Sequence, residues 1–97
     1  MTDSMVNIQI MPSVEGRDAL YPAVDAAIAV VQASGVKYEV GALGTTMEGD
    51  FDQLLDIVKE MNRAMISRGC PAVISQVRTF LTDGEADMEG LTAKFRD

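Results

Sequence analysis

The order in which strand-like and helix-like hydrophobic patterns follow one another is the strongest constraint on how this chain folds. Residues 5–11 alternate apolar and polar side chains with a period of two, which is typical of a strand with one buried face. The same alternation returns over residues 36–43 and 72–81, and residues 45–48 are short, threonine-rich and strand-like. Because Gly44 permits a tight connection, we expect the two middle strands to pair as a hairpin.

Two longer segments between these strands carry apolar residues at helical spacing. The first helix is expected to begin near Pro22, because the missing N–H of a proline is not needed in the first helical turn, and to end at Gly35, a left-handed cap. The second is expected to begin after Asp50, which forms a capping-box pattern with Gln53, and to run to Arg68.

The predicted element order is therefore strand, helix, strand, strand, helix, strand. Two right-handed crossovers joined by a hairpin give a four-stranded antiparallel sheet with both helices on one face, the ferredoxin-like βαββαβ sandwich of the α+β class. A chain of 97 residues can bury one core, so we expect residues 1–97 to form a single domain. The tail, 82–97, is acidic and then weakly amphipathic through Met88, Leu91 and Phe95, which predicts a short helix that docks on the body or on a partner.

Strand alternation assigns side chains to the two faces of the predicted sheet. Leu54 and Ile57 of the second helix should be fully buried against the helix-facing side. That side is expected to carry Val6, Ile8, Ile10, Tyr38, Val40, Val73 and Val77. The open side is expected to carry Asn7, Gln9, Lys37, Glu39, Thr46, Glu48, Ile74, Gln76 and Arg78. Such a mixed face commonly becomes a subunit interface, although a merely solvated face is the alternative.

Charge and residue usage exclude several classes of function. Fifteen acidic and eight basic side chains give a net charge of −7, whose field repels nucleic acid and anionic membrane surfaces. The chain has no histidine, which removes the commonest general base and the usual ligand of zinc and iron. We therefore expect no metal and no cofactor, and no partner that is a nucleic acid or a membrane.

The single cysteine, Cys70, follows a predicted helix C-terminus, where the negative end of the helix dipole disfavours a thiolate. We expect it to be structural. One cysteine cannot form an internal disulfide, which fits a reducing compartment. The longest apolar run, 26–31, is far shorter than the roughly 20 residues of a membrane span, and no targeting segment is visible. Together these features predict a cytoplasmic location.

Several stretches resemble a known family. Residues 34–62, SGVKYEVGALGTTMEGDFDQLLDIVKEMN, are similar to the signature of the small thiamine-binding protein family with the YkoF-like fold, and the most specific part is GTTMEG at 44–49. IQIMP at 8–12 and AVISQVRT at 72–79 lie where that family places its first and last strands. The resemblance implies ferredoxin-like domains that associate into dimers and tetramers, some of which bind thiamine or its hydroxymethylpyrimidine part.

The leading functional hypothesis is a non-catalytic small-molecule binding protein, by resemblance for thiamine or its pyrimidine precursor. An aminopyrimidine presents an exocyclic donor beside ring acceptors, so a carboxylate with neutral amides and hydroxyls is the matching chemistry. Glu48, Thr46, Asn7 and Gln9 are expected to converge on one ligand edge. The full set of candidate ligand-binding residues is Glu48, Thr45, Thr46, Asn7, Gln9, Ser75 and Gln76.

Two alternatives remain open. In one, the protein is an assembly or regulatory module whose open face is used up by self-association, as a homodimer or homotetramer, and no small ligand binds. In the other, it is an enzyme on the same scaffold. Because histidine is absent, that enzyme would need Tyr38 and Glu39, the one pair of candidate acid and base groups on a strand.

Overall fold

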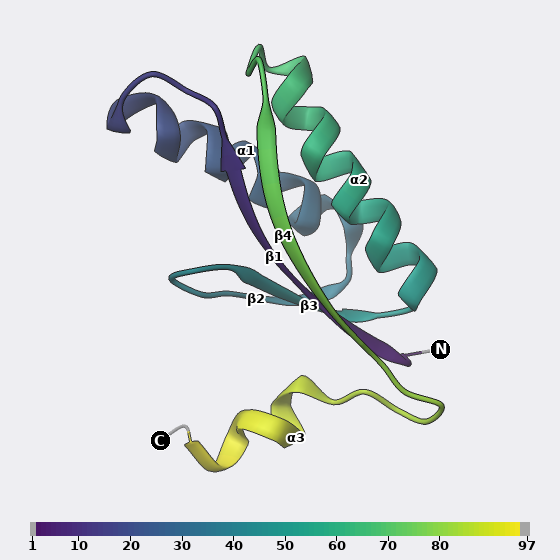
Figure 1. The fold of residues 1–97 in the computed structure, drawn as a ribbon. Coiled ribbons are helices and arrows are strands. Elements are labelled where there is room, and N and C mark those ends of the chain that lie inside the picture. The colour runs from purple at the N-terminus through teal and green to yellow at the C-terminus, as the bar shows by residue number, and fades with distance from the viewer. Residues whose placement is uncertain (1, 96–97) are drawn as a thin grey trace.

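The computed structural model describes residues 2–95 and contains a four-stranded antiparallel sheet covered on one face by two long helices (Figure 1). The spatial order of the strands is β2-β3-β1-β4. The fold is the predicted ferredoxin-like α+β sandwich. In chain order the elements are β1 (Ser4–Pro12), α1 (Arg17–Ser34), β2 (Lys37–Val40), β3 (Thr45–Gly49), α2 (Phe51–Ser67), β4 (Val73–Leu81), α3 (Met88–Thr92) and a 3₁₀ turn (Ala93–Phe95).

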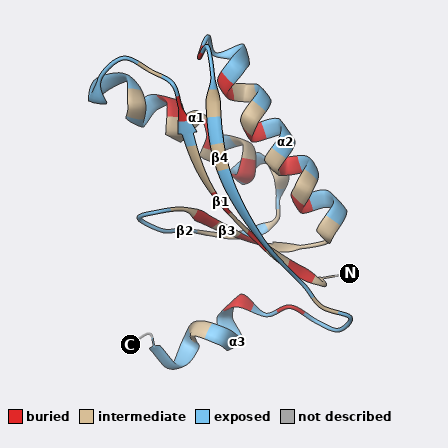
Figure 2. Ribbon diagram, viewed as in Figure 1, coloured by how far each residue is buried: buried red, intermediate tan, exposed pale blue. Residues whose placement is uncertain are grey.

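The core lies between the sheet and the two long helices, where the buried residues of Figure 2 gather. Val6 and Ile8 from β1 pack there with Met47 from β3. On α2, Leu54 and Ile57 are 0% and 4% exposed, which confirms that the register of this helix was predicted correctly. Cys70 is also buried in this core, in the position expected of a structural cysteine.

Two boundaries differ from the predicted ones by more than one residue, each with a local cause. Helix α1 begins at Arg17 instead of near Pro22, because Leu20 is half-buried one turn before Val24 and extends the apolar stripe toward the N-terminus. Strand β2 ends at Val40 instead of residue 43, because the N–H of Gly41 donates to the carbonyl of Gly44 at 2.8 Å and turns the chain.

The cap at the start of α2 is as predicted, and it shows why this helix begins where it does. The side chain of Asp50 accepts a hydrogen bond of 3.2 Å from the backbone N–H of Gln53, which satisfies one of the free donors of the first turn. The helix ends at Ser67, with Arg68 as its C-cap residue, one position before the predicted end. Gly69 follows with φ of 105°, a conformation that favours glycine.

The C-terminal segment runs back beside the N-terminus and then crosses to the open face of the sheet. The N–H of Thr82 donates to the carbonyl of Asp3 at 2.9 Å, and the N–H of Ala86 donates to the carbonyl of Thr2 at 3.0 Å. Figure 1 shows α3 on the side of the sheet away from α1 and α2. The predicted tail helix thus docks on the body, and residues 96–97 of the predicted tail lie outside the described part of the chain.

Over residues 2–95, no helix combines the length and the apolar character required to cross a bilayer.

Candidate functional site

The strand register places four polar side chains in one row across the open face of the sheet. Asn7 on β1 pairs with Thr46 on β3 at one side and with Arg78 on β4 at the other. Thr46 in turn pairs with Glu39 on β2. Because paired residues of adjacent antiparallel strands present their side chains on the same face, Glu39, Thr46, Asn7 and Arg78 form a continuous row, with a carboxylate at one end and a guanidinium at the other.

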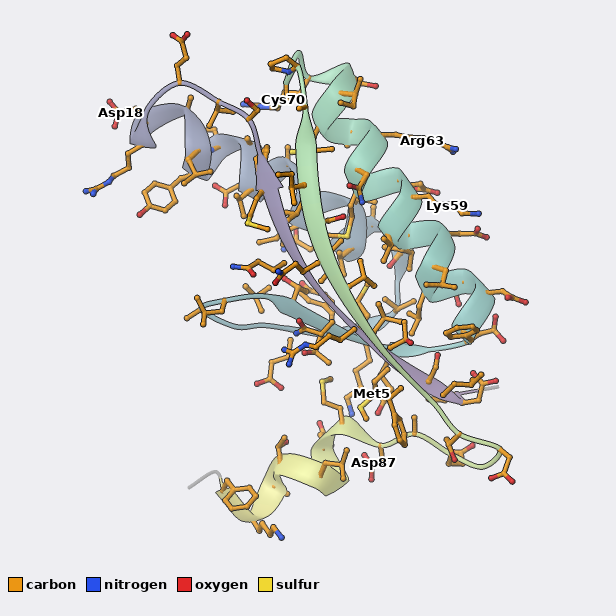
Figure 3. All side chains as sticks on the ribbon, viewed as in Figure 1. Met5, Asp18, Lys59, Arg63, Cys70 and Asp87 are labelled. Carbon is orange, nitrogen blue, oxygen red and sulfur yellow. The ribbon has the colours of Figure 1, made fainter. Side chains whose placement is uncertain are left out.

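A second row, adjacent to the first, holds the C-terminal helix against the sheet. It includes Glu48, which pairs with Lys37 on β2 and with Met5 on β1. The backbone N–H of Met88 donates a hydrogen bond of 2.6 Å to Oε1 of Glu48, while Oε2 lies 3.8 Å from Nζ of Lys37. Lys37 also forms an ion pair of 3.2 Å with Glu89 on α3. Figure 3 labels Met5 on the sheet and Asp87, the residue before α3, on the two sides of this contact.

These contacts alter the titration of Lys37. The pKa of its ammonium group is raised above the ordinary value, first because of the hydrogen bond to Glu89. Burial lowers the pKa by less than this bond raises it, and the negative charges of Glu89, Glu48 and Asp87 each raise it further. The charged form of Lys37 is therefore the one that favours the docked position of α3.

A cavity of about 370 Å³ lies between the first row and α3. Its floor is the row of four polar residues, its wall is the β2–β3 hairpin and its roof is α3. The volume lies at the lower end of the range of about 300–1,000 Å³ that is typical of small-molecule sites. The lining residues are Met5, Asn7, Glu39, Gly41, Leu43, Gly44, Thr46, Arg78, Met88, Leu91 and Thr92.

The floor of the cavity is ordered by contacts within the sheet. Nδ2 of Asn7 donates a hydrogen bond of 2.9 Å to Oγ1 of Thr46. The hairpin approaches so closely that a Cβ atom at Gly44 would lie 2.9 Å from Oδ1 of Asn7 and 3.1 Å from the carbonyl oxygen of Ile8. A side chain at this position would therefore displace the amide of Asn7 or lift the hairpin away from the floor.

The structure brings some of the predicted ligand-binding residues into the cavity. Asn7 and Thr46 line it directly. Glu48 lies in the adjacent row, outside the lining, and both of its oxygens face protein groups. Gln9 and Gln76 pair with each other on the same open face, one row further along the strands and also outside the lining.

Thr45 and Ser75 are on the opposite face of the sheet. Thr45 precedes Thr46 on β3 and is buried on the helix-facing side. Oγ of Ser75 donates a hydrogen bond of 3.1 Å to Oδ1 of Asn62 on α2. Strand alternation alone separates these two residues from the other five.

The proposed pair of catalytic groups is also divided between the faces. Tyr38 packs against the core, whereas Glu39 lines the cavity on the open side. Adjacent residues of one strand point in opposite directions, so these two groups do not meet over one substrate.

Several lining residues were absent from the predicted site. Glu39 and Arg78 were assigned to the open face but not to the ligand, although their register with Thr46 and Asn7 was the signal that could have found them. The roof, formed by Met88, Leu91 and Thr92, could not be placed over the sheet from residue patterns alone.

Comparison with known proteins identifies the family. The family model for the thiamine-binding protein matches residues 6–96. A UPF0045 protein of Clostridium perfringens is 43% identical over 91 residues, which cover 94% of this chain and 95% of that one.

Two solved structures have the same fold at recognisable sequence identity. A domain of unknown function, DUF77, from Bacillus cereus has a TM-score of 0.90 at 36% identity, covering 99% of this chain and 92% of that one. A Thermotoga maritima protein assigned provisionally to thiamine biosynthesis or salvage has a TM-score of 0.87 at 32% identity, covering 97% and 99% of the two chains. The chain described here belongs to the thiamine-binding protein family.

Proposed function

We propose that this protein binds thiamine or its hydroxymethylpyrimidine part, without catalysing a reaction, in the cavity between the open sheet face and α3. The observation that carries the proposal is the row of Glu39, Thr46 and Asn7 on the cavity floor, in a chain that belongs to the thiamine-binding protein family. Membership in this family and the likeness to the Thermotoga maritima protein support a thiamine-related ligand.

The chemistry of the cavity suits an aminopyrimidine ring. A carboxylate accepts several hydrogen bonds at once, and hydroxyl and amide groups both donate and accept, so Glu39, Thr46 and Asn7 match an amino group beside ring nitrogens. Met88 and Leu91 supply apolar contact for the faces of a ring. In this proposal Glu48 acts indirectly, because it holds the roof in place through the N–H of Met88.

The experiment is isothermal titration of thiamine and of hydroxymethylpyrimidine into the wild-type protein and two variants. Asn7→Ala removes an amide from the cavity floor, and we expect the affinity to fall about tenfold, the loss of one hydrogen bond of roughly 1–1.5 kcal/mol. Gln76→Ala is the matched control, since Gln76 lies on the same open face but outside the cavity. Equal losses in both variants, or no binding by the wild type, would contradict the proposal.

We also propose that the protein associates with itself through the part of the open face and edge that α3 leaves uncovered. The supporting observation is β4, an edge strand on which Ile74 is 67% exposed and Phe80 and Leu81 are also exposed. Large exposed apolar side chains clustered on one strand favour a protein interface. A homodimer or homotetramer is the proposed assembly.

The location of the protein is a separate proposal. The buried free thiol of Cys70 fits a reducing compartment, so we propose that the protein works in the cytoplasm.

A further inference from the structure

The cavity contains one cationic side chain whose charge the described residues do not neutralise. Arg78 lines the cavity from β4 and is exposed to solvent. Within residues 2–95 no carboxylate forms an ion pair with it, although the chain carries a net charge of −7. By contrast, Lys37 on the adjacent row contacts both Glu48 and Glu89. Among residues 2–95, the positive charge of Arg78 is therefore left for a ligand.

The side chain itself indicates the chemistry it would recognise. An arginine guanidinium presents five N–H donors in a planar fork that fits a phosphate or carboxylate with two parallel hydrogen bonds. Such charge-assisted bonds are stronger than those between neutral groups. A cation at this position is also unfavourable for unmodified thiamine, whose thiazolium ring carries a fixed positive charge and would be repelled.

The position of Arg78 in the row sets where the anion would be. Neighbouring strands are about 4.8 Å apart, so the backbones of Glu39 on β2 and Arg78 on β4 are separated by roughly 14 Å, three strand spacings. The two side chains lie at opposite ends of the floor, with Thr46 and Asn7 between them. A ligand that spans the row would meet a carboxylate at one end, neutral hydrogen-bonding groups in the middle and a guanidinium at the other end.

We propose that the cavity prefers the phosphorylated form of its ligand, with the amino-bearing ring toward Glu39 and the phosphate on Arg78. This inference rests on the proposed function and names the class of ligand within it: a phosphate monoester of thiamine or of the hydroxymethylpyrimidine. The phosphate neutralises Arg78, and in the thiamine ester it also offsets the thiazolium charge that Arg78 would repel.

The test is a set of titrations with five probes: thiamine, thiamine monophosphate, hydroxymethylpyrimidine, its phosphate ester, and inorganic phosphate alone. We expect the wild-type protein to bind each ester at least tenfold more tightly than the matching alcohol, and the preference to shrink as salt rises. We expect inorganic phosphate to bind far more weakly than either ester, because it lacks the ring. Bare phosphate that binds as tightly as an ester would overturn the proposal.

Variants of Arg78 separate this inference from the proposed function. Arg78→Met should reduce the preference for the esters to less than about twofold, whereas Arg78→Lys should keep part of it, because lysine retains the charge but not the fork. Arg63→Met is the matched control, since Arg63 lies on α2 on the other side of the sheet (Figure 3). Circular dichroism of each variant checks that the fold is intact.

The outcomes are distinct. Thiamine binding with no preference for its ester, or a preference that survives Arg78→Met, would overturn the role of Arg78 and leave the proposed function standing. No binding by any of the four organic probes would overturn both.

Discussion

The backbone N–H of Met88 donates a hydrogen bond of 2.6 Å to the carboxylate of Glu48, a residue 40 positions earlier in the chain. This bond joins α3 to the open face of the sheet. The side chain of Glu48 is only 10% exposed, and its other oxygen faces Lys37. Glu48 belongs to the GTTMEG stretch that resembles the family signature, and its contacts in the structure are those of a group that positions the cavity roof.

The first prediction concerns this bond. Glu48→Ala removes the acceptor, and a hydrogen bond to a charged group is worth about 1.5–3 kcal/mol, so we expect amide hydrogen exchange at Met88 to accelerate at least tenfold. Glu48→Gln retains an acceptor oxygen and should have a smaller effect. Glu60→Ala, an exposed glutamate on α2, is the control. Unchanged exchange in Glu48→Ala would mean that α3 is held by other contacts.

The second prediction is a pH dependence of the same contact. Because the pKa of Lys37 is raised in the folded protein, its contribution is complete below the unfolded value of 10.5 and is lost as the pH rises through the higher folded value. We expect the methyl NMR signal of Met88 to shift in this alkaline range in the wild type but not in Lys37→Met. Lys59→Met, which removes an exposed lysine of α2, should behave like the wild type. Identical titration of Met88 in all three proteins would contradict the prediction.

The third prediction tests the core. Leu54→Ala should lower the free energy of unfolding by roughly 2–5 kcal/mol, because Leu54 is fully buried and its truncation leaves a cavity in the core. Ile66→Ala on the same helix is the matched control, since Ile66 is 53% exposed and its truncation should cost less than about 1 kcal/mol. Chemical denaturation measures both. Similar losses in the two variants would show that the exposed and buried faces of α2 are not as described.

Much of this fold follows from local rules that act within a few residues. The cap at Asp50 depends on a bond to Gln53, and the faces of β1 depend only on the period of two. The same period of two shows why it was wrong to place Thr45 and Ser75 in one site with Thr46 and Gln76. Thr45 directly precedes Thr46 on β3, and Ser75 directly precedes Gln76 on β4, so the two members of each pair point to opposite faces of the sheet.

The cavity roof depends on contacts between distant parts of the chain, and these leave little trace in residue patterns. Helix α3 is only five residues long, with one buried side chain, Met88. Its place is set by backbone bonds from Thr82 and Ala86 to the N-terminal residues and by the acceptor at Glu48. Backbone groups are the same in every residue, so no amino-acid pattern marks which ones will pair.

The fourth prediction addresses self-association. Ile74→Asp places a charge on the exposed edge strand, and a charge buried at an interface without a partner costs several kcal/mol, so we expect the variant to be a monomer of about 10 kDa in sedimentation. Its far-ultraviolet circular dichroism should match that of the wild type, because Ile74 is outside the core. Ile66→Asp on α2 is the control. A wild type that is itself a monomer at micromolar concentration would rule out the proposed assembly.

The last prediction concerns the wall of the cavity at Gly44. A Cβ atom there would lie 2.9 Å from Oδ1 of Asn7 and 3.1 Å from the carbonyl oxygen of Ile8, so Gly44→Ala must displace the amide of Asn7 or lift the hairpin. Either movement disturbs the bond between Asn7 and Thr46 on the cavity floor. We therefore expect Gly44→Ala to weaken binding of the ligand at least as much as Asn7→Ala does.

The matched control is Gly84→Ala, where the nearest atom to an added Cβ is 3.9 Å away, an ordinary contact. Titration calorimetry measures the affinities, and thermal unfolding shows whether the core is intact, since Gly44 is outside the buried cluster. If the hairpin forms the cavity wall, the affinity falls in Gly44→Ala and not in Gly84→Ala. The Cβ atom of Gly44→Ala must move the side chain of Asn7 or the hairpin. If the affinity is nevertheless unchanged, the ligand does not bind next to Asn7.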